Sequence, residues 1–296
     1  MKKFVADFET CTWLEDETFV WAWAVCEIGN EDNLKIGTNI EGFIEFCKNE
    51  YNPTCYFHNA KFDLEFVIWW ALTNGYTHVI DSKDAKDMTF TTLIGEMGQF
   101  YSMTIYFKKQ GKYERKVTFY DSLKIIPFSV ENIAKGFNLP LSKLEIDYNK
   151  PRKRNHKLTL QERNYITNDV KIVAKALNTL FIEKLDRMTQ GANALSDYKR
   201  IISKHKFREM FPEINNKIDE DLRKSYRGGF TYLNPLYKGK EVGRGVVLDV
   251  NSLYPSPWQY YMKNLCLLIS LYIMMENIKM TLLTLYIFKC LLVVLK

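Results

Sequence analysis

The segment Phe4-Val5-Ala6-Asp7-Phe8-Glu9-Thr10 sets the architecture of the first part of this 296-residue chain. Three apolar residues lead into two carboxylates at alternate positions. Because successive strand side chains point to opposite faces, Asp7 and Glu9 would share one face while Phe8 packs on the other. Two buried carboxylates side by side resist ionisation unless a positive group lies between them. The segment therefore predicts a short buried strand whose acidic face binds a cation, with two solvated acids in a loop as the alternative.

A second segment, from Tyr51 to Trp70, combines a short apolar strand with a helix. Thr54-Cys55-Tyr56-Phe57 predicts the strand, and the residues from Phe62 onward are apolar enough to form a helix beneath it. Asp63 would then lie in the first helical turn, where the helix dipole favours a negative charge. Asn59 and Phe62 offer an amide for a sugar edge and an aromatic face for a base. A turn residue and a core residue are the alternatives for these two positions.

The third segment predicts a long helix. Thr159 and Glu162 have the spacing of a capping box, in which each side chain satisfies a backbone N–H at the helix start. Tyr165 and Asp169 are four residues apart and would lie on one helical face. The apolar positions that follow have helical spacing: Ile166, Val170, Val173, Leu177 and Leu180. A tyrosine hydroxyl one turn from a metal-binding aspartate can orient an attacking water; an ordinary amphipathic helix is the alternative.

Together the three segments place four carboxylates in apolar elements, which is the set that a site for two divalent cations needs. Carboxylate oxygens suit Mg²⁺ or Mn²⁺. Two such ions can catalyse in-line cleavage of a phosphodiester. The set therefore predicts a metal-dependent nuclease.

The three segments resemble the ExoI, ExoII and ExoIII motifs of proofreading exonucleases that use four carboxylates and a tyrosine. Four further motifs follow in order: Tyr120-Asp121-Ser122-Leu123, Leu141-Ser142-Lys143-Leu144, Tyr226-Arg227-Gly228-Gly229-Phe230 and Asp249-Val250-Asn251-Ser252-Leu253-Tyr254-Pro255. The series is similar to the protein-primed family B DNA polymerases of small phages and linear mobile elements, over roughly residues 1 to 256. It implies an α/β, RNase H-like 3′–5′ exonuclease domain followed by an incomplete polymerase palm.

The resemblance implies a role for each matching residue of the exonuclease domain. Two Mg²⁺ or Mn²⁺ ions would be held by Asp7, Glu9, Asp63 and Asp169. Tyr165 would position the water, and Lys143 would help to neutralise the scissile phosphate. Contacts to the single-stranded 3′ end of DNA are implied for Thr10, His58, Asn59, Phe62, Ser122, Leu123 and Tyr148. Ser122 and Leu123 also resemble a segment that contacts the terminal protein used as primer.

The later motifs imply contacts with the template and the incoming nucleotide. Tyr226, Arg227, Gly228 and Gly229 match a loop that couples the two activities and holds the template strand. Asp249 matches the first metal-binding aspartate of the palm, and Tyr254 matches the residue that senses the sugar of the incoming deoxynucleotide. Taken singly, the glycines predict only a turn, and Asp249 is a carboxylate at a strand end. The order of the motifs gives them their weight.

Composition agrees with a nucleic-acid enzyme without identifying one. The net charge is +6, from 41 basic and 35 acidic residues. Cations are concentrated in Lys150-Pro151-Arg152-Lys153-Arg154-Asn155-His156-Lys157, which could follow a phosphate backbone or form a solvated loop. Six cysteines without a CxxC pair argue against zinc and for a reducing cytoplasm. The N-terminus lacks the long apolar stretch of a secretory signal, so we expect a cytoplasmic protein that acts as a monomer.

We expect an exonuclease domain over residues 1–189 and the start of a palm over 190–256. Predicted strands cover 19–28, 55–57, 88–94, 99–107 and 116–120, in addition to the first strand. Predicted helices cover 40–47, 62–74, 130–137, 160–185 and 191–211.

The resemblance stops after Ser256. Residues 257–296 contain no Gly, Asp or Arg, and neither the lysine-containing fingers motif nor the second Asp-Thr-Asp palm motif is present. A frameshift in an AT-rich gene is the favoured explanation. The apolar runs Leu265–Met275 and Thr281–Phe288 are shorter than the roughly 20 residues of a membrane span, and a helical partner surface is the third alternative. We expect retained exonuclease chemistry and lost polymerisation, or alternatively an inactive remnant that binds single-stranded DNA or terminal protein.

Overall fold

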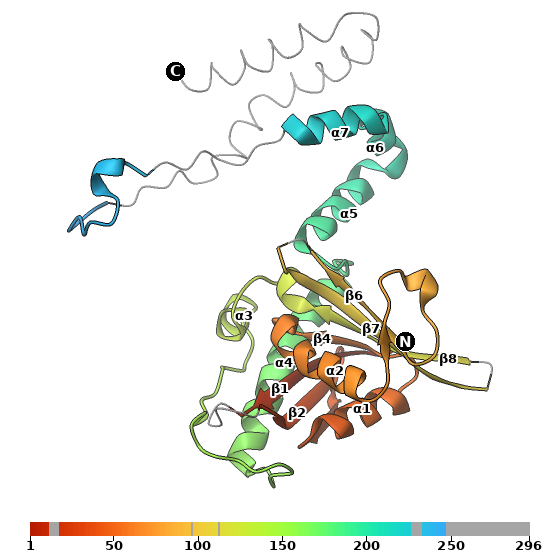
Figure 1. Cartoon of the computed structure of the whole chain (residues 1–296), viewed down its shortest axis with the longest axis vertical. Coiled ribbons are helices and arrows are strands. Elements are labelled where there is room, and N and C mark those ends of the chain that lie inside the picture. Colours follow the sequence, from red (N-terminus) through yellow and green to blue (C-terminus); the bar gives the residue numbers. More distant parts are fainter. Residues whose placement is uncertain (12–17, 96, 112, 226–232, 247–296) are drawn as a thin grey trace, which may run out of the picture. The chain divides into compact units, whose positions relative to one another are not determined.

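The computed structural model describes residues 1–11, 18–95, 97–111, 113–225 and 233–246 (Figure 1). The chain divides into two compact units, Met1–Ile202 and Ser203–Lys296. The first unit includes the helix at Gln190–Ile202, and the predicted boundary after residue 189 remains a prediction. The predictions for Tyr226, Arg227, Gly228, Gly229, Asp249 and Tyr254, and those for the tail 257–296, lie outside the described residues.

The first unit is organised around an eight-stranded sheet in the order β3-β2-β1-β4-β8-β7-β6-β5. β1 runs antiparallel to β2 and parallel to β4, which in turn runs parallel to β8. This meander of three antiparallel strands, continued by two parallel ones, is the RNase H-like arrangement, so the predicted α/β fold class is confirmed. The strands are β1 (Lys3–Thr10), β2 (Val20–Glu27), β3 (Asn30–Gly37), β4 (Thr54–Phe57), β5 (Thr77–His78), β6 (Thr89–Ile94), β7 (Phe100–Gln110) and β8 (Tyr113–Asp121).

Helices cover both faces of the sheet (Figure 1). α1 (Ile40–Asn49) and α2 (Ala60–Thr73) pack on one face, where they share a core with Phe4, Ala6 and Phe8 of β1. α3 (Val130–Gly136) and α4 (Leu160–Ile182) pack on the other face, in a second core that contains Val5. The predicted alternation along β1 is therefore confirmed, because its odd and even positions enter different cores. α5 (Gln190–Ile202) completes this unit.

Local sequence signals account for the helix starts. The Asn39 side chain accepts a hydrogen bond from the Gly42 N–H at 2.8 Å and caps α1. The predicted capping box of α4 is present, with Thr159 and Glu162 bonded reciprocally. α2 starts after Asn59, whose φ of 73° is left-handed, a conformation that asparagine tolerates better than most residues.

Several elements differ from the sequence prediction. The helical region expected over 191–211 is divided into α5 and α6 (Lys204–Met210) at Ser203, whose backbone has a φ of 73°. Such a residue cannot continue a right-handed helix. β3 was not predicted, because its sequence Asn30-Glu31-Asp32-Asn33-Leu34-Lys35-Ile36-Gly37 is mostly polar; pairing with β2 at the sheet edge holds it.

The described part of the second unit contains α6, α7 (Asn216–Ser225) and the short turn Pro235–Tyr237 (η3). α7 was not predicted, because its residues are nearly all polar and give no apolar period. Ion pairs one turn apart support it, between Arg223 and Asp219 and between Lys224 and Glu220. Two further short turns belong to the first unit, at Ser82–Asp84 (η1) and Ser122–Lys124 (η2).

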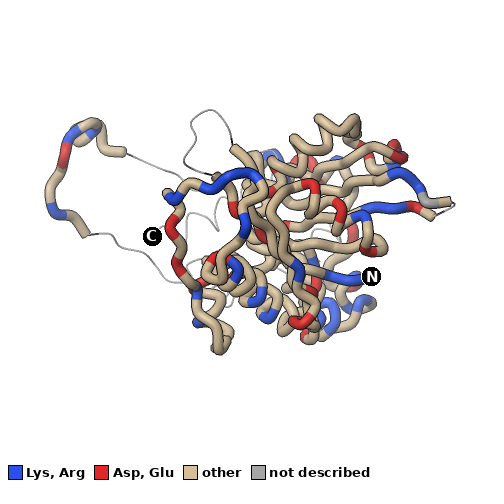
Figure 2. Tube along the Cα trace, turned by 90° about the horizontal axis from the view of Figure 1, so that it is seen from below, with Lys and Arg blue, Asp and Glu red and all other residues tan. Residues whose placement is uncertain are grey.

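Charged residues are spread over the first unit, with two concentrations of Lys and Arg (Figure 2). One concentration is the segment before α4, and the other is the β7–β8 hairpin. None of the helices in the described ranges combines the length and the apolar character that a bilayer span requires.

Candidate active site

The carboxylates meet where β1 ends beside α2 and α4. Asp7, Glu9 and Asp169 line a cavity of about 410 Å³, which we call the carboxylate cavity. Asp63 lies directly behind it: the Asp63 side chain is 4% exposed, and its Oδ1 accepts a hydrogen bond from the Phe8 N–H at 3.2 Å. The strand alternation and the helix phase predicted from the sequence thus bring all four acids to one place.

These acids are poorly solvated and repel one another. Burial, followed by repulsion from Asp169, raises the pKa of Asp7 to about 7. Burial and then Asp7 raise the pKa of Glu9 to about 9. Burial raises the pKa of Asp169 to about 6, and burial together with Asp7 raises the pKa of Asp63 well above its ordinary value. The Lys143 ammonium opposes these shifts at Asp7, Glu9 and Asp169.

The donor set suits a divalent cation. All four side chains offer hard oxygen ligands of the kind that Mg²⁺ and Mn²⁺ prefer. In the part of the chain that the structure describes, the buried Oδ1 of Asp169 has no hydrogen-bond partner. A cation would satisfy this oxygen and remove the repulsion that raises the carboxyl pKa values.

The four carboxylates lie near one another, but their oxygens do not converge on a single point. Across residues 1–11, 18–95, 97–111, 113–225 and 233–246, no group of three or more His, Cys, Asp or Glu is arranged so that it could hold a metal ion. Like charges keep apart unless a cation attracts them, and Asp63 is bonded instead to the backbone of β1. The assignment of the four acids as metal ligands therefore rests on their chemistry and their shared location.

Tyr165 lies between the acids and the second tyrosine of the site. Its hydroxyl is close enough to Asp169 to oppose the raised pKa of that carboxyl, as the shared helical face predicts. Its hydroxyl also contacts the Tyr148 hydroxyl, with an oxygen–oxygen distance of 2.5 Å. Burial and the nearby Glu9 raise the pKa of Tyr165, so the phenol stays protonated and able to donate. Tyr148 is 47% exposed and forms part of the cavity wall.

A hydrogen-bonded chain fixes His58 at the cavity. Its Nδ1 is 3.0 Å from the Ser122 hydroxyl, and its Nε2 is 2.7 Å from the Phe128 carbonyl. The Ser122 hydroxyl donates in turn to the Phe57 carbonyl at 2.9 Å. Burial lowers the pKa of His58. The structure thus gives Ser122 a positioning role under His58.

The residues predicted to contact DNA fall into two groups. Thr10, His58, Phe62 and Tyr148 line the carboxylate cavity together with Lys143. Asn59, Ser122 and Leu123 are not among its lining residues, and Ser122 is completely buried. Direct contact between the Ser122 side chain and a strand would require that residue to become accessible, so its effect on DNA would pass through His58.

Asp121 organises the second group and was not assigned a role from the sequence. Its Oδ1 accepts hydrogen bonds from the backbone N–H groups of Asn59, Ala60 and Leu123, at 3.1, 3.3 and 3.0 Å. The side chain therefore ties the end of β8 to the start of α2. An aspartate that ends a strand and is followed by serine is a turn signal that could have indicated this position.

The basic segment before α4 is partly structural. Arg152 is 4% exposed, and its Nε donates to the Glu162 carboxylate at 2.8 Å. Burial alone would raise the pKa of Glu162, but hydrogen bonds from Arg152, Thr159 and His156 lower it to about 2. Arg152 also lowers the pKa of Glu9. It is thus unavailable for the backbone of a nucleic acid, whereas Lys150, Lys153, Arg154 and Lys157 are exposed.

The fold and the site define an RNase H-like α/β domain with an acidic cavity at the end of its central strand. Residues 44–264 match the family described as DNA polymerase type B, organellar and viral. The chain belongs to this family, which confirms the resemblance drawn from the sequence motifs.

The relatives are phage DNA polymerases. That of Bacillus phage Nf is 46% identical over 255 residues, that of Bacillus phage phi29 is 42% identical over 255, and that of Streptococcus phage Cp-1 is 30% identical over 272. The solved structure of phi29 DNA polymerase with single-stranded DNA matches with a TM-score of 0.74 at 40% identity, and its orthorhombic crystal form with 0.76 at 41%. Each match covers 86% of this chain, and the chain spans 44% of each relative.

Proposed function

We propose that this chain is a metal-dependent 3′–5′ exonuclease that trims the single-stranded 3′ end of DNA, as the proofreading part of a protein-primed family B DNA polymerase. The observation that carries the proposal is the carboxylate cavity. It brings Asp7, Glu9 and Asp169 together with Tyr165 and Lys143, and Asp63 lies behind it.

The reaction is hydrolysis of the last phosphodiester. A water oxygen forms a bond to phosphorus, the bond from phosphorus to the 3′ oxygen of the preceding nucleotide breaks, and that oxygen takes a proton. The products are a 5′-deoxynucleoside monophosphate and a strand one nucleotide shorter. Two Mg²⁺ or Mn²⁺ ions, held by Asp7, Glu9, Asp63 and Asp169, would supply Lewis acidity and neutralise charge.

The remaining residues orient the reactants. Tyr165 is fixed by its hydrogen bond to Tyr148, so its hydroxyl can orient the water. Lys143 is exposed at the cavity, where its ammonium would neutralise the scissile phosphate. Positioning of this kind lowers the barrier because the reacting atoms are already aligned.

The strand would approach along α2. Phe62 is 49% exposed at the cavity, and its ring makes an edge contact with Phe66 at a centroid distance of 5.8 Å. Trp69 lies on the same helical face and is 61% exposed. Aromatic side chains in a row provide a stacking platform for successive bases. Thr10, His58 and Tyr148 would contact the terminal nucleotide, while Asn59 and Leu123 support the rim; Leu123 would also contact a terminal protein.

The later motifs belong to the polymerase activity of the family. We propose that Tyr226, Arg227, Gly228 and Gly229 hold the template strand, that Asp249 is a palm metal ligand, and that Tyr254 contacts a deoxynucleotide. The 296-residue chain has no Asp-Thr-Asp motif after Asp249. The trimming proposed for the carboxylate cavity needs none of these later motifs. We place its activity, as a monomer, in the cytoplasm of the host cell.

An assay with a 5′-labelled primer on a template, in Mg²⁺, with and without deoxynucleotides, tests the proposal. We expect shortening from the 3′ end when deoxynucleotides are absent. DNA binding without any shortening, in either Mg²⁺ or Mn²⁺, would replace the exonuclease with a binding function.

A further inference from the structure

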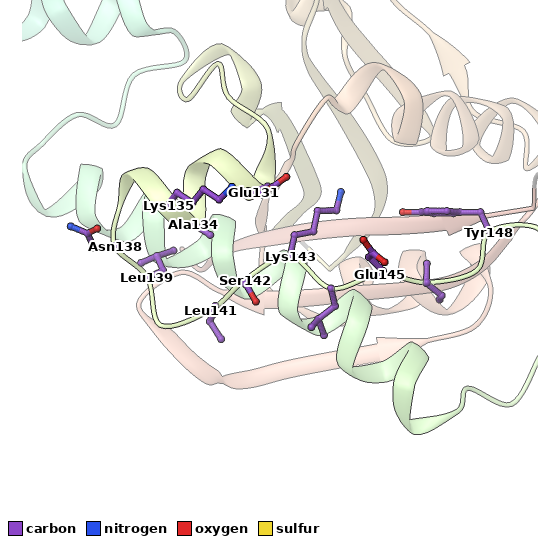
Figure 3. Close-up of a pocket in the computed structure, with 12 residues that line it drawn as sticks. Glu131, Ala134, Lys135, Asn138, Leu139, Leu141, Ser142, Lys143, Glu145 and Tyr148 are labelled. Atoms are coloured by element: carbon purple, nitrogen blue, oxygen red, sulfur yellow. Dashed lines mark hydrogen bonds and ion pairs between the residues drawn. The ribbon is translucent and has the colours of Figure 1, made fainter.

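A second and larger cavity adjoins the carboxylate cavity. It has a volume of about 930 Å³ and lies between α3 and the facing segment 138–148 (Figure 3). We call it the α3 cavity. Its volume is within the roughly 300–1,000 Å³ of sites that bind small molecules. None of the four carboxylates belongs to its lining, so it is distinct from the site of cleavage.

The two cavities share Lys143 and Tyr148. Apart from these two residues their linings differ. Ser129 and Val130 face the carboxylate cavity, whereas Glu131, Ala134 and Lys135 face the α3 cavity. A group held by Lys143 at the site of cleavage can therefore pass to the second cavity while it stays in contact with the same ammonium, because a lysine stem is long and flexible.

The lining of the α3 cavity combines cations with an apolar wall. Lys135 and Lys143 are exposed ammonium groups, and their side chains come from opposite sides of the cavity (Figure 3). Leu139, Leu141 and Ile146 line the wall and pack against the core. The ammonium groups could bind a phosphate, and the apolar wall could contact a base.

Polar groups of the lining suit the sugar and the edge of a base. Asn138 and Ser142 supply an amide and a hydroxyl, and Glu145 supplies a carboxylate that can accept from a sugar hydroxyl. Glu131 is paired with Lys135, at a distance of 2.6 Å between Oε1 and Nζ. Because this pair is exposed, it is weak, and a phosphate can compete for Lys135.

We propose that the α3 cavity receives the 5′-deoxynucleoside monophosphate released from the carboxylate cavity. The inference rests on the proposed nuclease function, which generates this product. Lys143 lines both cavities and Lys135 lines only the α3 cavity, so the phosphate of the product gains a second ammonium group there. The base then packs on the apolar wall, away from the strand that is being trimmed.

Binding of deoxyadenosine 5′-monophosphate to the full chain tests the inference without any need for catalysis. Calorimetry in EDTA removes binding that depends on a cation in the carboxylate cavity. Ser142→Tyr fills the cavity from an exposed position, and Lys135→Ala removes the second cation. Ser82→Tyr and Lys83→Ala are matched controls on the exposed turn η1.

We expect the parent chain and both controls to bind the nucleotide equally. Ser142→Tyr and Lys135→Ala should each weaken binding by about tenfold, the loss expected when one good contact disappears. Deoxyadenosine, which lacks the phosphate, should bind more weakly than the monophosphate and should not respond to Lys135→Ala. No binding to the parent, or equal binding to all five proteins, would overturn the inference. Binding with the expected losses but no trimming in Mg²⁺ or Mn²⁺ would refute the nuclease and leave the nucleotide site standing.

Discussion

The two faces of β1 carry opposite kinds of side chain on one backbone: one face is apolar and the other is acidic. On one face Phe8 is 5% exposed and makes edge contacts with Phe43 and Phe57, at centroid distances of 4.8 and 5.0 Å. On the other face burial and then Asp7 raise the pKa of Glu9, and burial and then Asp169 raise the pKa of Asp7. The first face stabilises the fold, and the second carries buried carboxylates that cost stability, which the proposed cation site would require. A functional site can thus be built on the most rigid strand of a domain, because the opposite face holds that strand in place.

Breaking the apolar face should have the largest effect on folding. Phe8→Ala removes a buried ring and two aromatic contacts, so we expect it to lower the free energy of unfolding by about 3–5 kcal/mol. Denaturant unfolding monitored by circular dichroism measures the loss. Leu144→Ala, at a side chain that is 41% exposed, is the control and should change little. Equal stability of the two variants would show that the aromatic face does not anchor β1.

Arg152 supports the acidic face from outside the strand. It forms an ion pair with Glu162 in which the side chains are 2% and 3% exposed. Arg152→Ala leaves Glu162 buried without this partner, and removal of one member of such a pair typically costs about 3–5 kcal/mol. Lys153→Ala, one residue along, is exposed and should instead weaken DNA binding and its salt dependence. A thermal melt and a DNA titration on both variants separate the two roles; matching losses in both assays would contradict the separation.

The acidic face should make stability depend on pH when no divalent cation is present. The folded pKa values of Asp169, Asp7 and Glu9 are raised to about 6, 7 and 9. The folded chain therefore binds more protons than the unfolded chain, and stability should fall as the pH rises through these values. Thermal midpoints in EDTA from pH 5 to pH 9 measure the fall, and Mn²⁺ should reverse most of it. A midpoint that is indifferent to Mn²⁺ at pH 8 would contradict the cation site.

The aromatic side chains Phe62, Phe66 and Trp69 of α2 should contribute the smallest effect, which is on the binding of single-stranded DNA. Trp69→Ala removes one stacking surface, so binding of a single-stranded oligonucleotide should weaken by an amount within the roughly 1–3 kcal/mol per base typical of such contacts. Fluorescence anisotropy with a labelled oligonucleotide measures this, with Ile80→Ala, at an exposed position, as the control. If both variants bind like the parent, the strand does not run along α2.

Periodicity explains why much of the site was predictable. The alternation in Asp7-Phe8-Glu9, the first-turn position of Asp63 and the one-turn spacing of Tyr165 and Asp169 are local, and the structure has all three. The capping box at Thr159 is local as well. Each of these features depends on the spacing of residues within one helix or strand, and this spacing can be read directly from the sequence.

The features that sequence analysis missed depend on contacts between distant segments. β3 is a polar strand that pairing with β2 holds in place. Arg152 belongs to a run of lysines and arginines that resembles a DNA-binding segment. It is nevertheless buried against Glu162 and the Trp21 ring, whose centroid is 4.3 Å from the guanidinium carbon. Asp121 binds backbone groups some 60 residues away, with sequence separations of 62 and 61 residues to Asn59 and Ala60. The α3 cavity lies between a helix and the loop that follows it, and the sequence of these two segments does not indicate its volume.

We propose that the acidic face of β1 and the facing acid of α4 bind cations for 3′ trimming. The most direct measurement compares the parent chain with the double variant Asp7→Ala and Asp169→Ala, on a 5′-labelled single strand in Mn²⁺. The variant should keep or raise its thermal midpoint in EDTA, because two repelling carboxylates are gone, while its trimming rate falls on the order of a thousandfold or more. Trimming by the folded double variant at the rate of the parent would contradict the account.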